Sequence, residues 1–396
     1  MMKVIIFCER QVQNMLKKSI AEEVEILEWI YMDHINEELE DCIEKIYPYY
    51  KETMGPVACI MSGIRRNKEV ILRMLTAMGV SQKNILDVYK TYRARFPRER
   101  YRRIMDKWQR GKLDGIILGI SHGLTGILEN YMPGVCCNFC ESSQDIHFNY
   151  KTLQGLYFEY YMLMQDIKYA VIDMFDYTYF NYDTLQTGEC ETYLEESGFI
   201  CENRLLCNQV LVEEINEKLR TRWSEGTNNE ERELLNEIFP KIEEADPGVY
   251  REWVILEERK HNLTEKEINE YKEKPFFSSI QLKVFEATLE FQIDNFYKMI
   301  HFLKRINPKI KIYLLLIPKY CEVEEMESTV NSMWKKLFME IVNKIQNEYS
   351  DIELLDLKNY KQFSTEKENY YDLTHFNYIG AQRFTEYLSN LIIKSM

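Results

Sequence analysis

The sequence has no uninterrupted apolar run close to the roughly 20 residues that a membrane-spanning helix needs. It begins MMKVIIFCER, which lacks the charged start, long apolar stretch and small-residue cleavage site of a secretory signal peptide. We therefore expect no membrane span, and we expect the chain to work in the cytoplasm.

Positive charge is also scarce. The 396 residues include 50 Lys and Arg against 64 Asp and Glu, a net charge of −14. This balance disfavours general binding to nucleic acid or to anionic membranes, because both require a basic face, which here would have to be local. In residues 90–112, however, arginines are interleaved with aromatic residues. We favour the solvated face of a connecting helix for this run, although it also suits an anionic sugar, a nucleotide or an RNA segment.

Without a secretory signal, the ten cysteines are expected to be reduced thiols and not a disulfide framework. Three of them crowd into GVCCNFC, residues 134–140. No second cluster of His and Cys follows at the spacing of a zinc site. We therefore predict no metal, and we interpret the segment as a buried strand in which Cys acts as a small apolar residue.

Short apolar runs alternate with amphipathic segments through the first ninety residues, at 3–8, 24–30, 57–61 and 84–89. This alternation predicts a small Rossmann-like α/β domain, which with its basic connector covers residues 1–105. No GxGxxG turn follows the first run, so a nucleotide-dependent enzyme is a minor alternative. A scaffold or docking surface is the favoured role.

A second alternating series begins at residue 113 and ends with the apolar runs 310–318 and 351–357. Near-continuous apolar strands of this kind are expected in a parallel sheet that is covered on both faces. The second domain is therefore predicted over residues 106–396. The long charged stretches at about 184–280 are interpreted as a helical insertion over one edge of this second sheet.

The stretch GIILGISHGLTGIL, residues 115–128, is a predicted strand that turns at Ser121 into a helix. A serine hydroxyl becomes a nucleophile only when a base removes its proton and a third group orients that base. Of the six histidines, His375 fits best, because Asp372 precedes it by three residues on a predicted loop. His122 adjoins the serine but should diverge from it, whereas His147 could approach. The remaining histidines lie in helix-like or charged surroundings, namely His34, His261 and His301.

These motifs resemble those of the SGNH (GDSL) esterase and acyltransferase superfamily. The G-D-S block appears as Gly119, Ile120 and Ser121, with Ile in the place of Asp. The D-x-x-H block with its following Asn and Gly matches residues 372–380. The resemblance covers roughly residues 106–396. It implies a three-layer, flavodoxin-like parallel sheet of the SGNH type, a Ser121 nucleophile, a His375 base oriented by Asp372, and no cofactor.

The sequence departs from the family where the oxyanion is held. Members use backbone N–H groups of the nucleophile and of a Gly after the second strand, together with an Asn after the third. Here the second strand is followed by ESSQD, so Ser143 would replace the Gly. After the third strand no residue matches the family's Asn cleanly, so Tyr177 and Asn181 are the candidates for a side-chain donor. We include Gly119, in the nucleophile turn, with these oxyanion and substrate-binding candidates.

The resemblance implies acyl-ester chemistry on a carbohydrate of a bacterial surface polysaccharide. Hydrolysis is favoured over transfer, which would require an acyl donor such as acetyl-CoA. The alternative is a relative that kept the fold, lost the activity and serves as a binding or assembly module in polysaccharide biosynthesis. The imperfect third block and the additional N-terminal domain suggest this alternative.

Overall fold

The computed structural model describes residues 2–33, 39–51, 55–95, 113–186, 194, 216–218, 220–221, 229–242 and 259–396. The chain divides into two compact units, each with its own parallel sheet. The first unit contains residues 1–98 and 216–258, and the second contains residues 99–215 and 259–396. No helix among the described residues is long and apolar enough to cross a membrane.

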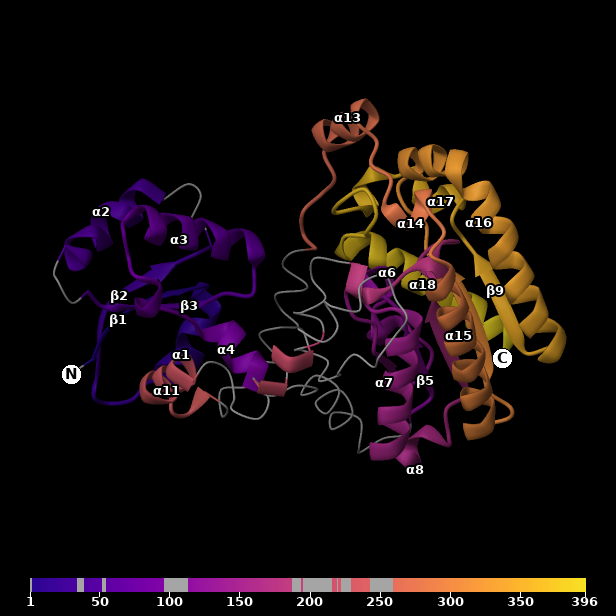
Figure 1. Cartoon of the computed structure of the whole chain (residues 1–396), viewed down its shortest axis with the longest axis horizontal. Helices are drawn as coiled ribbons and strands as arrows, with labels where there is room; N and C mark the ends of the chain where they lie inside the picture. Colours follow the sequence, from indigo (N-terminus) through magenta and orange to yellow (C-terminus); the bar gives the residue numbers. More distant parts are fainter. Residues whose placement is uncertain are drawn as a thin grey trace. The chain divides into compact units, whose positions relative to one another are not determined.

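The first unit is built on a parallel sheet whose strands β1, β2 and β3 are labelled in Figure 1. The sheet has four strands in the order β2-β1-β3-β4. Its strands are β1 (Met2–Cys8), β2 (Val24–Tyr31), β3 (Val57–Met61) and β4 (Ile85–Asp87). Side chains alternate along β1, so that Val4 and Ile6 pack on one face of the sheet while Ile5 and Phe7 pack on the other. Helices cover both faces, namely α1 (Gln13–Ser19), α2 (Leu39–Tyr50), α3 (Arg65–Ala77) and α4 (Val88–Arg95).

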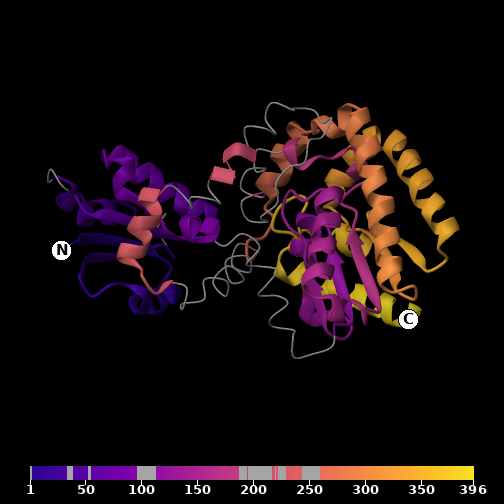
Figure 2. The same cartoon turned by 60° about the horizontal axis from the view of Figure 1, so that its bottom comes forward.

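The segment predicted as an insertion over the second sheet, about 184–280, lies mostly outside the described residues, and one described part of it differs from the prediction. Helix α11 (Asn229–Ile238) belongs to the first unit and lies beside its strands in both views (Figures 1 and 2). Its apolar side chains Leu235 and Ile238 are buried in the same cluster as β1 and β3. An amphipathic pattern shows that a helix has an apolar face but not which sheet that face will cover.

The second unit contains a five-stranded, all-parallel sheet in the order β6-β5-β7-β8-β9. Its strands are β5 (Gly115–Leu118), β6 (Cys136–Asn138), β7 (Tyr169–Asp173), β8 (Lys311–Leu316) and β9 (Ile352–Asp356). The register is unbroken where β7 pairs with β8, from Tyr169 opposite Lys311 to Asp173 opposite Leu315. The two all-parallel sheets confirm the predicted α/β class.

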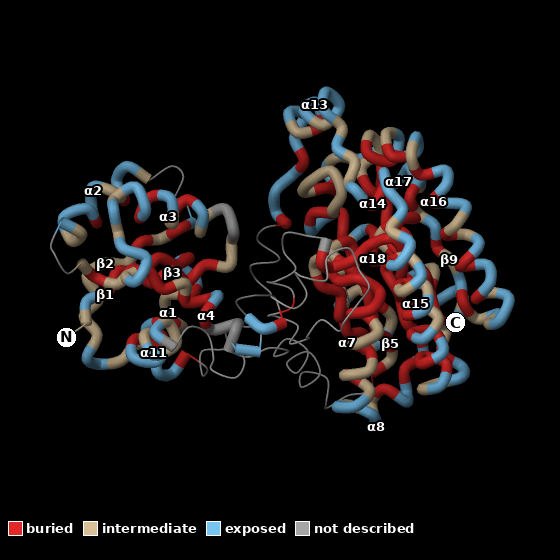
Figure 3. The backbone as a smooth tube through the Cα atoms, viewed as in Figure 1, coloured by how far each residue is buried: buried red, intermediate tan, exposed pale blue. Residues whose placement is uncertain are grey.

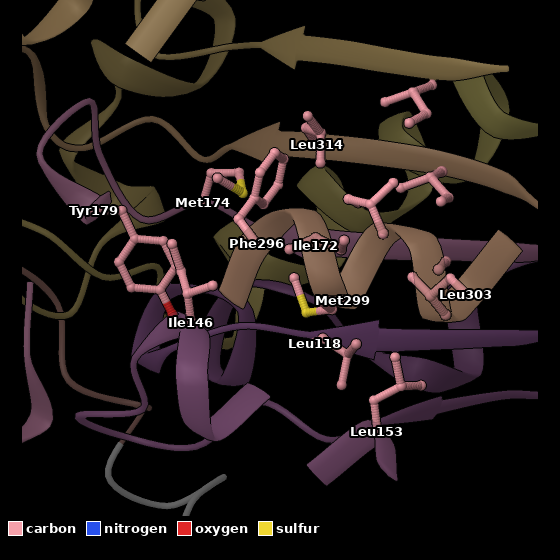
Figure 4. Packing of buried hydrophobic residues seen from close by; sticks show 14 of the residues in the cluster. Leu118, Ile146, Leu153, Ile172, Met174, Tyr179, Phe296, Met299, Leu303 and Leu314 are labelled. Atoms are coloured by element: carbon pink, nitrogen blue, oxygen red, sulfur yellow. The ribbon is translucent and has the colours of Figure 1, made fainter. Parts of the chain in front are cut away.

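Helices bury both faces of this second sheet. Leu118, Ile172 and Leu314 point to one face, where α7 and α15 pack over them (Figure 4). Ile117 and Val171 point to the other face, toward α18. The inner strands β5, β7 and β8 are accordingly apolar along almost their whole length, and their residues are mostly buried (Figure 3). The helices are α6 (Ser121–Gly126), α7 (Ile146–Glu159), α8 (Tyr161–Met164), α13 (Glu265–Glu273), α14 (Ser279–Leu282), α15 (Glu286–Ile306), α16 (Cys321–Glu348), α17 (Lys361–Ser364) and α18 (Tyr378–Ser395).

The arginine-rich run at residues 90–112 is described only as far as residue 95, at the end of α4. The rest of the run lies outside the described residues. Neither of its two interpretations is tested.

Candidate functional site

The turn after β5 has a backbone shape that requires glycine. Gly119 has φ 151°, in the region that side chains disfavour. A Cβ atom at this position would stand 2.4 Å from the Cβ of Asp173 at the end of β7. The absence of a side chain therefore lets two neighbouring strand ends approach closely, and the chain continues directly into α6 at Ser121.

Asp173 stabilises this turn through hydrogen bonds from the backbone N–H groups of the turn. Its buried carboxylate accepts backbone N–H groups from Gly123 at 2.6 Å and from Phe175 at 2.9 Å, and it lies 3.4 Å from the N–H of Ile120. Burial raises the pKa of Asp173 to about 6, against the opposing effect of these N–H groups. The carboxylate thus fixes the start of α6 and, with it, the backbone that carries Ser121. The sequence signal for this role is an acidic residue at the end of an apolar strand, which our sequence reasoning did not use.

Ser121, His375 and Asp372 lie in hydrogen-bonding contact. The Ser121 Oγ is 2.9 Å from His375 Nε2, although 254 residues separate them. On the other side of the ring, Nδ1 is 2.9 Å from Asp372 Oδ2 and 3.1 Å from Oδ1. The structure therefore brings together the three residues that the two motifs predicted.

The charge state of Asp372 suits a partner of an imidazole. Partial burial would raise the pKa of its carboxyl group, but the attraction of the carboxylate to the protonated form of His375 and the hydrogen bonds that the carboxylate accepts outweigh burial. The pKa of Asp372 consequently lies well below its usual range, and the group is ionised at neutral pH. A carboxylate here favours the tautomer of His375 that carries its proton on Nδ1, which leaves Nε2 free to accept a proton from Ser121.

Backbone contacts hold the loop of His375 in shape. Asp372 accepts the N–H groups of Thr374 at 2.7 Å and of His375 at 2.8 Å. Asn377 caps α18 by accepting the N–H of Gly380 at 2.9 Å, and its amide donates to the carbonyl of Glu368 at 2.7 Å. A Cβ at Gly380 would lie 2.0 Å from the backbone oxygen of Asn369, so the helix packs on this loop through a bare backbone. Asn377 and Gly380, which the motif singled out, are thus positioned to fix the loop.

Ser143 lies in the loop after β6, the strand next to β5. Its φ of 62° places it in the left-handed region that glycine adopts freely and serine does not. The Ser143 carbonyl accepts the hydroxyl of Thr184 at 2.8 Å, which anchors the loop. The serine therefore adopts a backbone conformation that favours glycine.

The two predicted side-chain donors are engaged elsewhere, and the structure does not support them as oxyanion donors. The Tyr177 hydroxyl donates to Asp356 at 2.6 Å. The Asn181 amide donates to the carbonyls of Ile280 and Lys283, both at 2.8 Å. A hydroxyl has one proton and an amide has two, so neither side chain has a donor left for an oxyanion. Both instead tie the segment after β7 to distant parts of the unit.

The two histidines near the motifs lie in different places. His147 is buried on α7, where its Nδ1 is 3.0 Å from Asn295 Oδ1 of α15. His122 forms no hydrogen bond with Ser121, as expected, but its ring stacks on that of His375 at a centroid distance of 4.6 Å. The side chains of Ser121 and His122 thus diverge from each other, and His122 contacts the site by stacking on the ring of His375.

A buried ionic cluster occupies the carboxyl ends of β7, β8 and β9, and sequence reasoning did not find it. Lys319 Nζ lies 2.5 Å from Asp176 and 2.8 Å from Glu327. Lys358 Nζ lies 3.1 Å from Asp176 and 3.0 Å from Glu324. The two ammonium groups hold the pKa of Asp176 well below its usual range despite burial, so its carboxylate stays charged.

The cysteine-rich strand does not present its thiols together. Cys136 and Cys137 are consecutive residues of β6, and they join the apolar clusters on opposite faces of the sheet. Burial raises the pKa of Cys136, which favours the neutral thiol over the thiolate that binds metals. Among the described residues, no group of three or more His, Cys, Asp or Glu side chains is placed to hold a metal ion.

Neither models of known protein families nor curated proteins give a match to this chain. Its chemistry therefore has to be inferred from the site. An alcohol, an imidazole and a carboxylate in line can move one proton from the alcohol to the imidazole. The turn around Gly119, which approaches Asp173 closely, determines where that alcohol lies.

Proposed function

We propose that this chain performs serine-dependent acyl-ester chemistry with Ser121 as the nucleophile. The observation that carries the proposal is the 2.9 Å contact between Ser121 Oγ and His375 Nε2, with Asp372 bound to the far nitrogen. This distance lies within the range at which an imidazole can remove a hydroxyl proton.

The reaction follows from the three groups. The Ser121 oxygen attacks the carbonyl carbon of an ester while His375 Nε2 takes the hydroxyl proton. The C–O bond of the ester then breaks, and His375 returns the proton to the departing alcohol, which leaves an acyl group on Ser121. Water or a second alcohol reverses the sequence, giving the free acid or a new ester. Asp372 keeps the imidazole oriented and stabilises its positive charge in both halves.

The negative oxygen of the tetrahedral intermediate is proposed to be held by backbone N–H groups of Ser121 and Ser143. Gly119 shapes the turn that carries the first of these and contributes no side chain. Because Tyr177 and Asn181 are engaged, we propose that neither of these two side chains contributes a donor to the oxyanion hole. Loss of one donor typically slows acyl transfer by roughly 10²- to 10³-fold, so slow turnover is expected.

The order of the strands supports an SGNH-type fold for the second unit. In chain order its strands run 2-1-3-4-5 across the sheet, the flavodoxin-like arrangement. Ligands of such sheets bind where the order reverses, between the first and third strands. Here these are β5, which leads into Ser121, and β7, which ends at Asp173. We propose a carbohydrate ester of a bacterial surface polysaccharide as the substrate, with hydrolysis favoured over transfer.

Covalent labelling tests the nucleophile. A fluorophosphonate should add to Ser121 with loss of fluoride, and peptide mass spectrometry should locate the adduct there. Ser121→Ala should abolish labelling, and His375→Ala should slow it by at least about 10³-fold. His301→Ala is the matched control, because His301 pairs with Glu348 on the protein surface. Folded protein that stays unlabelled would refute the proposal.

A second experiment separates hydrolysis from transfer. The protein is given acetylated sugars alone, and then acetyl-CoA together with unmodified sugars. Free acetate in the first reaction indicates an esterase. Acetylated sugar in the second reaction indicates a transferase.

The second candidate function is a binding or assembly module that lacks activity. The observation in its favour is that both predicted side-chain donors, Tyr177 and Asn181, are engaged elsewhere. It predicts saturable carbohydrate binding that is unchanged in Ser121→Ala, with no turnover of aryl acetates. Turnover that disappears in this variant would exclude it.

A further inference from the structure

The imidazole of His375 lies against a second imidazole. The ring of His122 is inclined by only 15° to that of His375, at a centroid distance of 4.6 Å. The His122 ring also contacts Phe175, and the centroids of these two rings are 5.0 Å apart. Tyr371 also lies nearly parallel to His375, at 5.5 Å and 21°. Aromatic rings of both motif regions and of the β7 loop thus gather around the proposed base.

His122 is buried, and within the described part of the chain neither of its ring nitrogens has a hydrogen-bond partner. Burial holds the pKa of His122 well below its usual value. Positive charge on His375, when its imidazole is protonated, and on Lys319 lowers this pKa further. The ring is therefore neutral. A buried polar group without a partner costs stability, so its presence beside the nucleophile calls for an explanation.

The hydrogen bonds of His375 leave one motion of its ring weakly restrained, and the stacked ring of His122 can restrain that motion. Asp372 and Ser121 fix the two nitrogens of the ring, but they restrain its tilt about the line between those nitrogens much less. A parallel ring packed against the face restrains that tilt. It can also face the positive imidazolium that forms during the reaction, because a neutral aromatic face attracts a cation.

We propose that His122 is a positioning residue, whose neutral ring holds His375 in the orientation that directs Nε2 at the Ser121 hydroxyl. This inference rests on the proposed acyl-ester chemistry. In this proposal the flat face of the His122 ring orients His375, and the ring nitrogens of His122 have no part in it. A residue with a flat ring should therefore replace it, and a residue of similar bulk without a ring should not.

The test compares His122→Phe with His122→Leu in the full chain. Fluorophosphonate labelling gives two separate quantities, the fraction of molecules labelled and the rate constant for each labelled site. We expect His122→Phe to keep the rate constant within about threefold of the original. We expect His122→Leu to lower it by roughly 10- to 100-fold, because a small misplacement of a reacting group has effects of this size. With an aryl acetate as substrate, kcat of His122→Leu should fall while its KM should change little.

His147→Leu is the matched control, since it removes another buried imidazole of the same unit, one whose Nδ1 lies 3.0 Å from Asn295 Oδ1 of α15. It should lower the melting temperature and leave the rate constant per labelled site unchanged. The inference is overturned if His122→Leu reduces only the labelled fraction, because this would be a purely structural effect. It is also overturned if the Phe and Leu variants lose activity equally, because the nitrogens would then matter. An unlabelled original protein would refute the proposed function itself.

Discussion

At the scale of single residues, the site depends on a carboxylate that is not one of the three reacting groups. Asp173 is fully buried and joins the turn of Ser121 to the loop after β7 through backbone N–H groups. Two effects act in opposite directions on the pKa of its carboxyl group, because burial favours the neutral acid and the N–H groups favour the anion. Burial prevails, so this group should make stability depend on pH.

The pH dependence has a definite sign. The pKa of Asp173 is raised from 3.8 to about 6, so between these values the folded chain holds the proton and the unfolded chain has lost it. The stability from this group is present below the lower value and is lost as pH rises through the upper one, by roughly 3 kcal/mol. The free energy of unfolding of the original protein, measured relative to that of Asp173→Asn, should therefore decrease from about pH 4 to about pH 7. Urea unfolding at several pH values measures it, and a constant difference would contradict the raised pKa.

At the scale of elements, the start of α6 depends on the missing side chain of Gly119. In Gly119→Ala the new Cβ would meet Asp173 at 2.4 Å in an unfavourable φ region. We expect a loss of about 3 kcal/mol or more in the free energy of unfolding, with slower labelling of Ser121. Gly126→Ala, in the same helix, is the control because its nearest neighbour would be 3.4 Å away. Denaturant unfolding of both variants checks this, and equal losses would contradict the account.

The ionic cluster at the ends of β7, β8 and β9 gives a second prediction at this scale. Lys319→Met leaves Asp176 and Glu327 buried without one of their cations, which should cost roughly 3 to 5 kcal/mol. Lys298→Met is the control, since its pair with Asp294 is more than half exposed and should contribute little. Thermal unfolding compares the two variants. A similar small shift in both would show that the cluster does not stabilise the strand ends.

At the scale of the whole molecule, the first unit is assembled from two separate stretches of the chain. Helix α11 comes more than a hundred residues after β4, yet Leu235 is completely buried in the core of the first unit. The connection between the two stretches of this unit includes the segment that carries Ser121. The two sheets nevertheless have separate apolar clusters, so their stabilities can be probed separately.

Leu235→Ala tests this organisation. Removing a fully buried leucine side chain should destabilise its own unit by about 2 to 5 kcal/mol. Hydrogen exchange read by mass spectrometry should then speed up in peptides of β1 and β3, while peptides of β5 and β7 keep their protection. The labelling rate of Ser121 should not change below the melting temperature. Loss of protection in β5 instead would place α11 with the second unit.

Much of the site could be predicted because its parts are local in the sequence. Glycine before Ser121 at the end of an apolar strand indicates a tight turn into a helix, and Asp372 three residues before His375 can fold back on it. Strand periodicity likewise predicts two parallel sheets. Each of these features depends on neighbours within a few positions, so the residues themselves carry the information.

The sequence by itself therefore determined the α/β class and the identity of the three residues in contact. Only the tertiary structure decided which donors are engaged, as with Tyr177, which binds Asp356 179 positions away. It also decided that α11 covers the first sheet, that Asp173 supports the turn, and that His122 stacks on His375. These features depend on which distant surfaces meet when apolar faces are buried, and local periodicity does not encode that choice.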